Sequence, residues 1–272
     1  MKNKLMVKVF LLLAWSASFM AVAADNAVTD SDRIEQYREM ISDGNPADFD
    51  EMRGEELWKK AAGPKQASLE KCDLGKGEGV VKGAYAQMPR YFADTKMVQD
   101  LESRLLTCMT TLQGFTEDEV AAKPFASEKK PSDISSLATY VVGQSKGIKM
   151  AVSTKHPKVK ESYEIGKRIF NYRAGPYDFA CSTCHATSGV RIRMQDLPNF
   201  HVKKDAQSAY VSWPAYRVSQ GLTRSFQWRL NDCFRQQRFP EPKFASEATV
   251  ALTTYLAVSA NGAEYVGPGL KR

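Results

Sequence analysis

Histidine and cysteine are scarce in this sequence, and the scarcity limits the metal sites that it can build. The 272 residues include three histidines, none before His156, and five cysteines. A structural zinc site of the common kinds needs a second Cys-x-x-Cys pair or a His-x-x-x-His pair, and the sequence has neither. The first half of the chain therefore offers no histidine to a metal ion.

Long apolar runs and a strong charge are lacking as well. Beyond residue 22, no stretch reaches the ~20 apolar residues that a membrane-spanning helix needs, so we expect no membrane span. The formal net charge of +7 falls to +4 without Lys2, Lys4 and Lys8. Such a mild excess of positive charge does not indicate a nucleic acid partner.

The N-terminus has the pattern of an export signal. The three lysines precede an apolar run over residues 9–22, and an Ala-x-Ala cleavage site lies at 21–23. A membrane anchor is the alternative, but the run is short for one and the acidic Asp25 follows at once. The pattern predicts a signal peptide over residues 1–23 and a mature protein in the periplasm, where disulfides form.

The sequence Cys-Ser-Thr-Cys-His at 181–185 is the most specific motif of the chain. In such a motif the two thiols, here Cys181 and Cys184, bond to the vinyl groups of a haem, and the histidine, here His185, ligates the iron. A thioredoxin-like redox pair does not need the histidine, and half of a zinc site would lack its other half. The motif therefore predicts a c-type cytochrome with one covalently bound haem c.

Helical patterns on both sides of the motif indicate the fold. Residues 163–170 are expected to form a helix in which Gly166 lets another helix cross closely, and residues 247–259 to form an amphipathic helix. Two helices that cross beside a Cys-x-x-Cys-His loop resemble the cytochrome c fold, although these residues would also suit any helical core. We expect an all-α, mainly helical chain.

The ligand on the opposite face of the iron is harder to assign. Met194 is the only methionine after His185 and follows it by nine residues, a short span in which to pass around the haem. His201 lies a little farther along the chain and His156 precedes the motif. Cys233 follows His185 by 48 residues, the separation expected of a distal ligand. A thiolate is a strong iron ligand, and the positive iron would keep it deprotonated. We therefore expect Cys233 as the distal ligand.

Arginines are frequent around this cysteine. In a helix, Arg229 and Cys233 share a face at positions i and i+4, so the guanidinium can favour the thiolate and bind a small oxyanion. Four outer arginines are expected to lie on a solvated face or to pair with haem propionates: Arg217, Arg224, Arg235 and Arg238.

The chain contains an internal repeat. The segment 104–109, Arg-Leu-Leu-Thr-Cys-Met, reappears as Arg-Leu-Asn-Asp-Cys-Phe at 229–234. The segment 137–147, which begins Leu-Ala-Thr-Tyr, matches 252–262, which begins Leu-Thr-Thr-Tyr. Two matches in the same order indicate a duplication.

The repeat predicts two tandem cytochrome c-like domains, the first without haem, with residues 122–131 as a loop inside the first. The predicted division has four parts: a signal peptide (1–23), an N-terminal helical segment with Trp58 as a candidate docking anchor (24–65), a degenerate cytochrome c-like domain (66–150) and a haem-binding cytochrome c-like domain (151–272).

Two cysteines of the first half have no part in haem attachment. In an exported protein Cys72 and Cys108 are natural disulfide partners, and the bridge would stabilise the fold by on the order of 3–4 kcal/mol. This pairing leaves Cys233 alone, and an unpaired cysteine in an oxidising compartment calls for a reason. Iron ligation together with chemistry would supply one.

These features together resemble the SoxA family of sulfur-oxidation cytochromes. The likeness rests on the export signal, the two cytochrome-like halves, Cys-Ser-Thr-Cys-His, and the run Arg-Leu-Asn-Asp-Cys-Phe-Arg-Gln-Gln-Arg at 229–238, and it covers most of the mature chain. Many members carry two haems. This chain lacks the first attachment motif, so it resembles the monohaem branch, and that departure strengthens the disulfide prediction.

The resemblance implies an L-cysteine S-thiosulfotransferase, which joins thiosulfate oxidatively to a cysteine of the SoxYZ carrier while electrons leave through haem. It implies that Cys233, a persulfide in the family, is both the catalytic sulfur and the distal iron ligand. It also implies that Arg229 is catalytic and binds the substrate. The implied partners are a SoxX-like monohaem cytochrome c in a heterodimer and SoxYZ in a transient complex.

Two other functions fit part of the sequence. A periplasmic electron-transfer cytochrome c without transferase activity would place Met194 or His201 on the iron and leave the lone cysteine inert. A binding subunit would dock a partner cytochrome through Trp213, Tyr216 and Trp228, although aromatic residues at this spacing are more often core residues.

Overall fold

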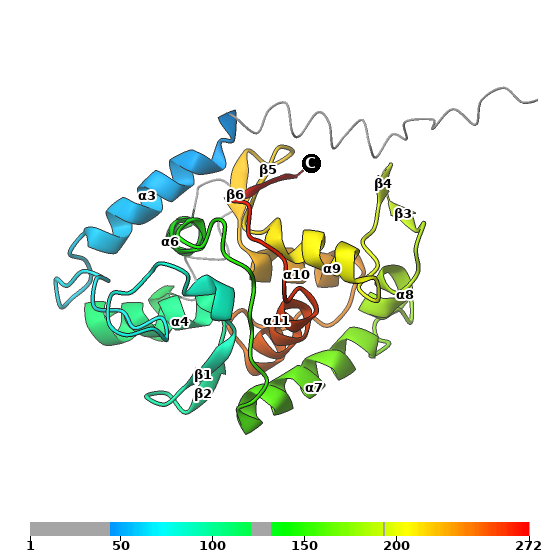
Figure 1. Cartoon of the computed structure of the whole chain (residues 1–272), viewed down its shortest axis with the longest axis horizontal. Coiled ribbons are helices and arrows are strands. Elements are labelled where there is room, and N and C mark those ends of the chain that lie inside the picture. The colour runs from blue at the N-terminus through cyan, green and yellow to red at the C-terminus, as the bar shows by residue number, and fades with distance from the viewer. Residues whose placement is uncertain (1–43, 121–131, 193, 272) are drawn as a thin grey trace, which may run out of the picture.

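The computed structural model describes residues 44–120, 132–192 and 194–271. The predicted signal peptide and the predicted loop at 122–131 lie outside this part of the chain. Among the helices of the described part, none is long and apolar enough to cross a membrane. Figure 1 shows two groups of elements side by side, one from each half of the chain.

The N-terminal group combines helices with one antiparallel hairpin, β1–β2, in which Tyr91 lies opposite Val98. Its elements are α3 (Ala47–Lys59), the 3-10 turn η2 (Tyr85–Gln87), β1 (Arg90–Phe92), β2 (Met97–Gln99), α4 (Leu101–Cys108), the π-helical turn η3 (Met109–Gln113) and α6 (Asp133–Gly143).

The C-terminal group is also mainly helical. Strands β3 and β4 form a hairpin, and β5 lies between antiparallel β6 and parallel β7. Its elements are α7 (Pro157–Asn171), α8 (Cys181–His185), β3 (Arg191–Ile192), β4 (Gln195–Asp196), α9 (Lys203–Val211), β5 (Ala215–Arg217), β6 (Leu222–Arg224), α10 (Phe226–Gln236), α11 (Glu247–Ser259) and β7 (Gly269–Lys271). The chain is therefore mainly helical, with short strands that the sequence did not predict.

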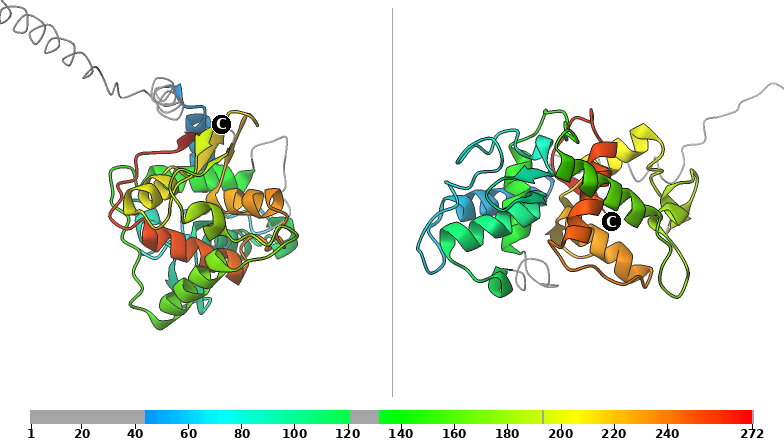
Figure 2. Two further views of the ribbon diagram at one scale, coloured as in Figure 1. Left: turned by 90° about the vertical axis from the view of Figure 1, so that its right-hand side faces the viewer. Right: turned by 90° about the horizontal axis from the view of Figure 1, so that it is seen from below.

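Gly166 lets α7 and α11 cross in contact, as the right-hand view of Figure 2 shows. A Cβ atom on Gly166 would lie 1.9 Å from the carbonyl oxygen of Ala251 and 2.9 Å from the Cβ of Tyr255. One turn later, Phe170 packs on Tyr255 with 5.2 Å between the ring centroids. The prediction of a close helix crossing at Gly166 is confirmed.

The first half contains a similar crossing, between α3 and α6. A Cβ atom on Gly54 would lie 2.0 Å from the carbonyl oxygen of Ser136 and 2.8 Å from the Cβ of Tyr140. Trp58 packs on Tyr140 with 6.1 Å between the ring centroids, and it is only 3% exposed. The prediction of Trp58 as a docking anchor is wrong, because its side chain belongs to the core of the first half.

Helix α11 has the bounds that the sequence predicts, but it is not amphipathic. All residues over 249–257 are buried, including the polar Thr253 and Thr254. Helices α7, α9 and α10 contact it from different directions. Because α11 is the central helix of the C-terminal group, both its apolar and its small polar residues face protein.

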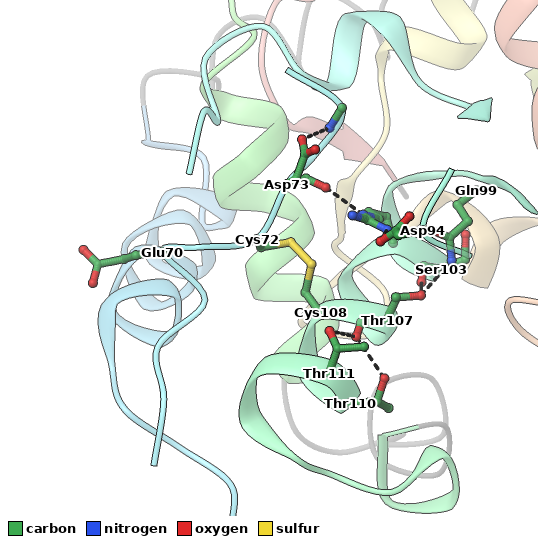
Figure 3. Close-up of a disulfide and its surroundings, with 12 residues drawn as sticks. Glu70, Cys72, Asp73, Asp94, Gln99, Ser103, Thr107, Cys108, Thr110 and Thr111 are labelled. Carbon is green, nitrogen blue, oxygen red and sulfur yellow. Dashed lines mark hydrogen bonds and ion pairs between the residues drawn. A yellow bond between two sulfur atoms is a disulfide. The ribbon is translucent and has the colours of Figure 1, made fainter. Parts of the chain in front are cut away.

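A disulfide joins Cys72 to Cys108, with 5.6 Å between the Cα atoms (Figure 3). The bridge predicted from the sequence is present, and it ties the loop after α3 to the end of α4. Beside it, Arg104 donates to the carbonyl oxygen of Asp73 and to the carboxylate of Asp94, each at 2.7 Å. In the first half, the arginine and the cysteine of the repeated segment are thus structural.

The two groups share one hydrophobic core, which also encloses polar contacts. Gln227 of α10 donates from its side-chain Nε2 to Asp100 at 2.6 Å and from its backbone nitrogen to Glu102 at 3.2 Å. Asp100 is the N-cap residue of α4 and accepts the backbone N–H of Ser103. These bonds hold α10 against α4.

Candidate active site

The Cys-Ser-Thr-Cys-His segment, predicted to attach haem, forms a short helix of its own, α8, after the loop that follows α7. The hydroxyl of Thr183 accepts the backbone N–H of Ala180 at 2.9 Å and so stabilises the first turn. Cys181 and Cys184 are both free thiols that are partly buried. Among the described residues, no cluster of three or more metal-binding side chains could hold an ion by itself.

His185 is oriented as a ligand. Its Nδ1 lies 2.9 Å from the carbonyl oxygen of Pro198, and its ring meets that of Phe200 edge-on, with 5.5 Å between centroids. Burial lowers the pKa of His185, the bond to Pro198 opposes this shift, and the charge of Arg229 adds to it. A neutral imidazole that donates Nδ1–H to a carbonyl presents the lone pair of Nε2 to a metal.

A cavity of about 450 Å³ lies next to the motif, lined by residues of α7, α8, α10 and α11. Cys181 forms part of its wall, and most of the other lining side chains are apolar, among them Ile169, Leu230, Phe234 and Leu252. Pockets of this size and polarity are typical of cofactor sites. An apolar cavity beside two thiols and an oriented imidazole fits a covalently bound haem.

Helix α10 brings Arg229 and Cys233 to the motif. The hydroxyl of Ser225 accepts the backbone N–H of Trp228 and caps the helix, so Arg229 and Cys233 follow one turn apart on the same face. Burial raises the pKa of Cys181, and charge on Cys233 raises it further, so the two thiols interact electrostatically. The segment around Cys233 is helical, which meets the condition under which Arg229 and Cys233 were expected to share a face.

Burial controls the protonation of Cys233 more than its neighbours do. Burial raises the pKa of this thiol, the positive charges of Arg229 and Arg217 lower it, and the carboxylate of Asp232 raises it further. The net shift is upward, so these protein groups alone favour the thiol at neutral pH. A ligated iron would be needed to favour the thiolate.

Two residues near Cys233 were missed or undervalued in the sequence. The carboxylate of Asp232 accepts a hydrogen bond from Arg229 Nη1 at 3.0 Å and another from Arg235 Nη2 at 2.6 Å. The i, i+3 spacing of these residues on one helix could have indicated both bonds. Arg217 was expected to lie on a solvated face or to pair with haem propionates; its charge also lowers the pKa of Cys233 from β5. Only the tertiary fold brings β5 to α10, so no local signal could have found it.

The alternative iron ligands lie elsewhere. Met194 is 58% exposed on the β3–β4 hairpin, and His201 is exposed after β4. His156 is the N-cap residue of α7 and stacks on Tyr91 with 4.0 Å between ring centroids. None of these three side chains is part of the described lining of the cavity, and neither are Cys233 and His185, so the lining does not distinguish the candidates.

The three aromatic residues considered as partner anchors have different surroundings. Trp213 is buried at 6% exposure, and Tyr216 and Trp228 are half-buried. The guanidinium of Arg224 lies 4.7 Å from the ring centroid of Trp228. None of the three is part of the described lining of the cavity, so they are not pocket residues, and Trp213 cannot anchor a partner.

Comparison with known proteins identifies the family. Residues 53–150 match the family model described as SoxA/TsdA, cytochrome c domain. The L-cysteine S-thiosulfotransferase subunit SoxA of Hydrogenophilus thermoluteolus is 50% identical over 99% of this chain and 100% of that protein. A protein of the same name from Hydrogenobacter thermophilus is 35% identical over 84% of this chain and 82% of its own length.

The fold agrees with these matches. The crystal structure of SoxXA from P. pantotrophus aligns with a TM-score of 0.71 and 24% identity, and the alignment covers 87% of this chain and 84% of that chain. Such a similarity shows a shared backbone arrangement. With the full-length identity to SoxA of Hydrogenophilus thermoluteolus, it leads to one conclusion: the chain belongs to the SoxA family of L-cysteine S-thiosulfotransferase subunits.

Proposed function

We propose that this protein catalyses the oxidative conjugation of thiosulfate to a cysteine of the SoxYZ carrier, as an L-cysteine S-thiosulfotransferase. The full-length similarity to proteins of that name supports the activity. The observation that carries the proposal is that α10 holds an unpaired thiol, Cys233, one turn after a guanidinium, Arg229, and that the charges of these two groups act on Cys181 and His185 of α8. A plain electron carrier needs neither group there.

The cofactor in this proposal is one covalently bound haem c. Cys181 and Cys184 would hold it through thioether bonds, and His185 and Cys233 would ligate its iron. The single Cys-x-x-Cys-His motif of the sequence and the apolar cavity beside Cys181 support this assignment. The bound haem supplies an acceptor that takes electrons one at a time.

The reaction forms a bond between the outer sulfur of thiosulfate and the sulfur of the carrier cysteine. Written with R for the carrier, RSH and S₂O₃²⁻ give RS–S–SO₃⁻, one proton and two electrons. Thiosulfate is oxidised together with the thiol, and both electrons must leave the site. A haem held in the cavity beside Cys181 would accept them.

Each site residue has a definite task in this reaction. Cys233 takes the outer sulfur of thiosulfate into a disulfide, and the carrier thiolate then attacks that sulfur and displaces Cys233. A persulfide on Cys233 is the form that the family resemblance implies. Arg229 binds the sulfonate oxygens of the anion, because a guanidinium matches two oxygens with two N–H groups.

The proposal includes partners and a location. The similarity to a SoxXA structure supports a heterodimer with a SoxX-like monohaem cytochrome c, and the reaction requires a transient complex with SoxYZ. The N-terminal pattern of residues 1–23 supports export to the periplasm. The aromatic pair Tyr216 and Trp228 remains available as part of a partner surface.

We also propose two tandem cytochrome c-like domains, with only the second binding haem. The paired crossings at Gly54 and Gly166 support the duplication. The first domain would begin with α3 rather than at residue 66, because α3 crosses α6 within the first half and the family match begins at residue 53. The second domain, from residue 151 onward, would be catalytic.

Replacement of Cys233 tests the proposed function. In the haem-loaded complex, Cys233→Ala should abolish thiosulfate transfer to SoxYZ while the haem stays covalently attached. Electron paramagnetic resonance should show thiolate ligation in the wild type and lose it in the variant. Met194→Leu and His201→Ala are matched controls that should keep both transfer and signal. Unaltered turnover in Cys233→Ala would exclude this residue from catalysis, whereas a wild-type complex that transfers no thiosulfate would leave a simple electron carrier.

A further inference from the structure

Asp232 immediately precedes Cys233 on α10, and its carboxylate is almost completely enclosed. The side chain is 3% exposed, compared with 27% for Arg229 and 62% for Arg235. A buried carboxylate is unfavourable unless positive charges and hydrogen-bond donors compensate it. The groups that compensate Asp232 all come from the same helix.

Three donors converge on this carboxylate. Oδ1 accepts a hydrogen bond from Arg235 Nη2 at 2.6 Å. Oδ2 accepts one hydrogen bond from Arg229 Nη1 at 3.0 Å and another from Gln236 Nε2 at 2.6 Å. The bonds from Arg235 and Gln236 fix the plane of the carboxylate. One oxygen is thereby aimed at Arg229.

The anchored guanidinium keeps most of its donors. Arginine has five N–H groups, and the bond to Asp232 comes from Nη1 only. Arg229 and Cys233 lie one turn apart on the same face of α10, so the guanidinium can bind the oxygens of an anion that reacts at Cys233. A free arginine side chain samples many rotamers, and ordering it upon binding weakens the interaction.

We propose that Asp232 is the positioning residue for Arg229: its carboxylate holds the guanidinium beside Cys233 before the anionic sulfur substrate arrives. This inference rests on the proposed function for the identity of the substrate. It also explains why an acidic residue is present in a site for an anion, where its charge by itself opposes binding.

A double-mutant cycle in the haem-loaded complex tests the coupling. Asp232→Asn should lower kcat/KM for thiosulfate by about 10–100-fold, mainly through kcat, because misplacing a binding group by about 1 Å has effects of this size. In the Arg229→Ala background, the same substitution should change kcat/KM by less than about twofold, because no guanidinium is left to position. An equal loss in both backgrounds, or no loss in the first, would overturn the proposal.

Gln236→Ala is the matched control. It removes one of the three donors to Asp232 and leaves the ion pair between Asp232 and Arg229 in place, so the loss of kcat/KM should be much smaller than that of Asp232→Asn. A loss as large as that of Asp232→Asn would mean that any disturbance of the carboxylate impairs the site through the helix, and it would overturn the specific role of Arg229.

A measurement on the wild-type protein covers the case in which Asp232→Asn fails to fold. In the ferrous holoprotein, nuclear magnetic resonance relaxation of the Arg229 Nε–Hε pair should give an order parameter near that of rigid backbone, about 0.85. A value below about 0.6 would contradict an anchored guanidinium. The order parameter does not depend on turnover. If the protein were inactive with thiosulfate, the proposed function would be refuted, but the order parameter would still test whether Arg229 is anchored.

Discussion

At the scale of single residues, Gly166 determines how closely α7 and α11 can approach. An added methyl group would meet the carbonyl oxygen of Ala251, a backbone atom that cannot rotate away as a side chain can. Overpacking typically costs about 1–3 kcal/mol. A gain of about 1 kcal/mol in helix propensity offsets part of that cost. Because the added methyl group would meet a backbone atom, we expect a cost near the upper end, so that Gly166→Ala lowers the free energy of unfolding by about 1–2 kcal/mol, as measured by urea denaturation.

The control for this substitution is Gly44→Ala. A Cβ atom at position 44 would meet no atom within 4 Å, so the free energy of unfolding should change little. If Gly166→Ala were as stable as the wild type, the helices would have room to move apart, and the crossing would not depend on the glycine.

The sequence predicted those site residues whose role depends on residues close to them along the chain. It could not predict site residues whose role depends on tertiary packing. Cys181, Cys184 and His185 lie in one short motif, and Arg229 and Cys233 share a helix face by spacing alone. Arg217 reaches Cys233 from a strand that only the tertiary fold brings near α10. Its neighbours in the sequence could not indicate this.

At the scale of elements, the helix over Glu247–Ser259 was predicted correctly and its environment was not. Apolar positions in a sequence indicate one buried face, but they give no information on how many helices pack around it. Small polar residues such as Thr253 and Thr254 can bond to the carbonyl oxygen four residues earlier, so they can be buried as well. Three helices enclose α11, which the sequence pattern alone could not reveal.

The disulfide is a property of this scale, because it ties a loop to the end of α4. It closes a loop between residues that are 36 positions apart, and such a restraint on the unfolded chain contributes about 3–4 kcal/mol. The double substitution Cys72→Ser with Cys108→Ser should lower the free energy of unfolding by about this amount in urea denaturation.

The matched treatment for the disulfide is a reductant. Reduction of the wild-type protein should lower its stability toward that of the double variant, whereas the double variant itself should not respond. A wild-type protein that loses nothing on complete reduction of Cys72 and Cys108 would show that packing of the first half, and not the bridge, holds the loop.

At the scale of the whole molecule, the duplication was visible in the sequence, but the contact between the halves was not. The repeated segments suggest two similar units without indicating which surfaces meet. The contact includes the carboxyl groups of Asp100 and Glu102, which accept hydrogen bonds from Gln227 of the other half. Sequence reasoning assigns acidic residues to the surface by default, so their burial could not be expected.

The buried pair gives the protein a stability that depends on pH. Burial and the neighbouring carboxylate of Asp100 raise the pKa of Glu102 from its ordinary value of 4.5 to about 8. Between these two values the folded protein keeps a proton that the unfolded chain releases, so the free energy of unfolding falls as the pH rises through this window. The loss from this group should be on the order of a few kcal/mol between pH 5 and pH 8.

Glu102→Gln should remove this part of the pH dependence, because a glutamine resembles the protonated carboxyl and still offers an oxygen to the backbone N–H of Gln227. Urea denaturation should find the variant close to the wild type at pH 5 and more stable than the wild type at pH 8. Glu241→Gln, a change at an exposed carboxylate, should leave the wild-type profile intact. If the free energy of unfolding of Glu102→Gln fell with pH as steeply as that of the wild type, Glu102 would be ionised in the folded protein between pH 5 and pH 8.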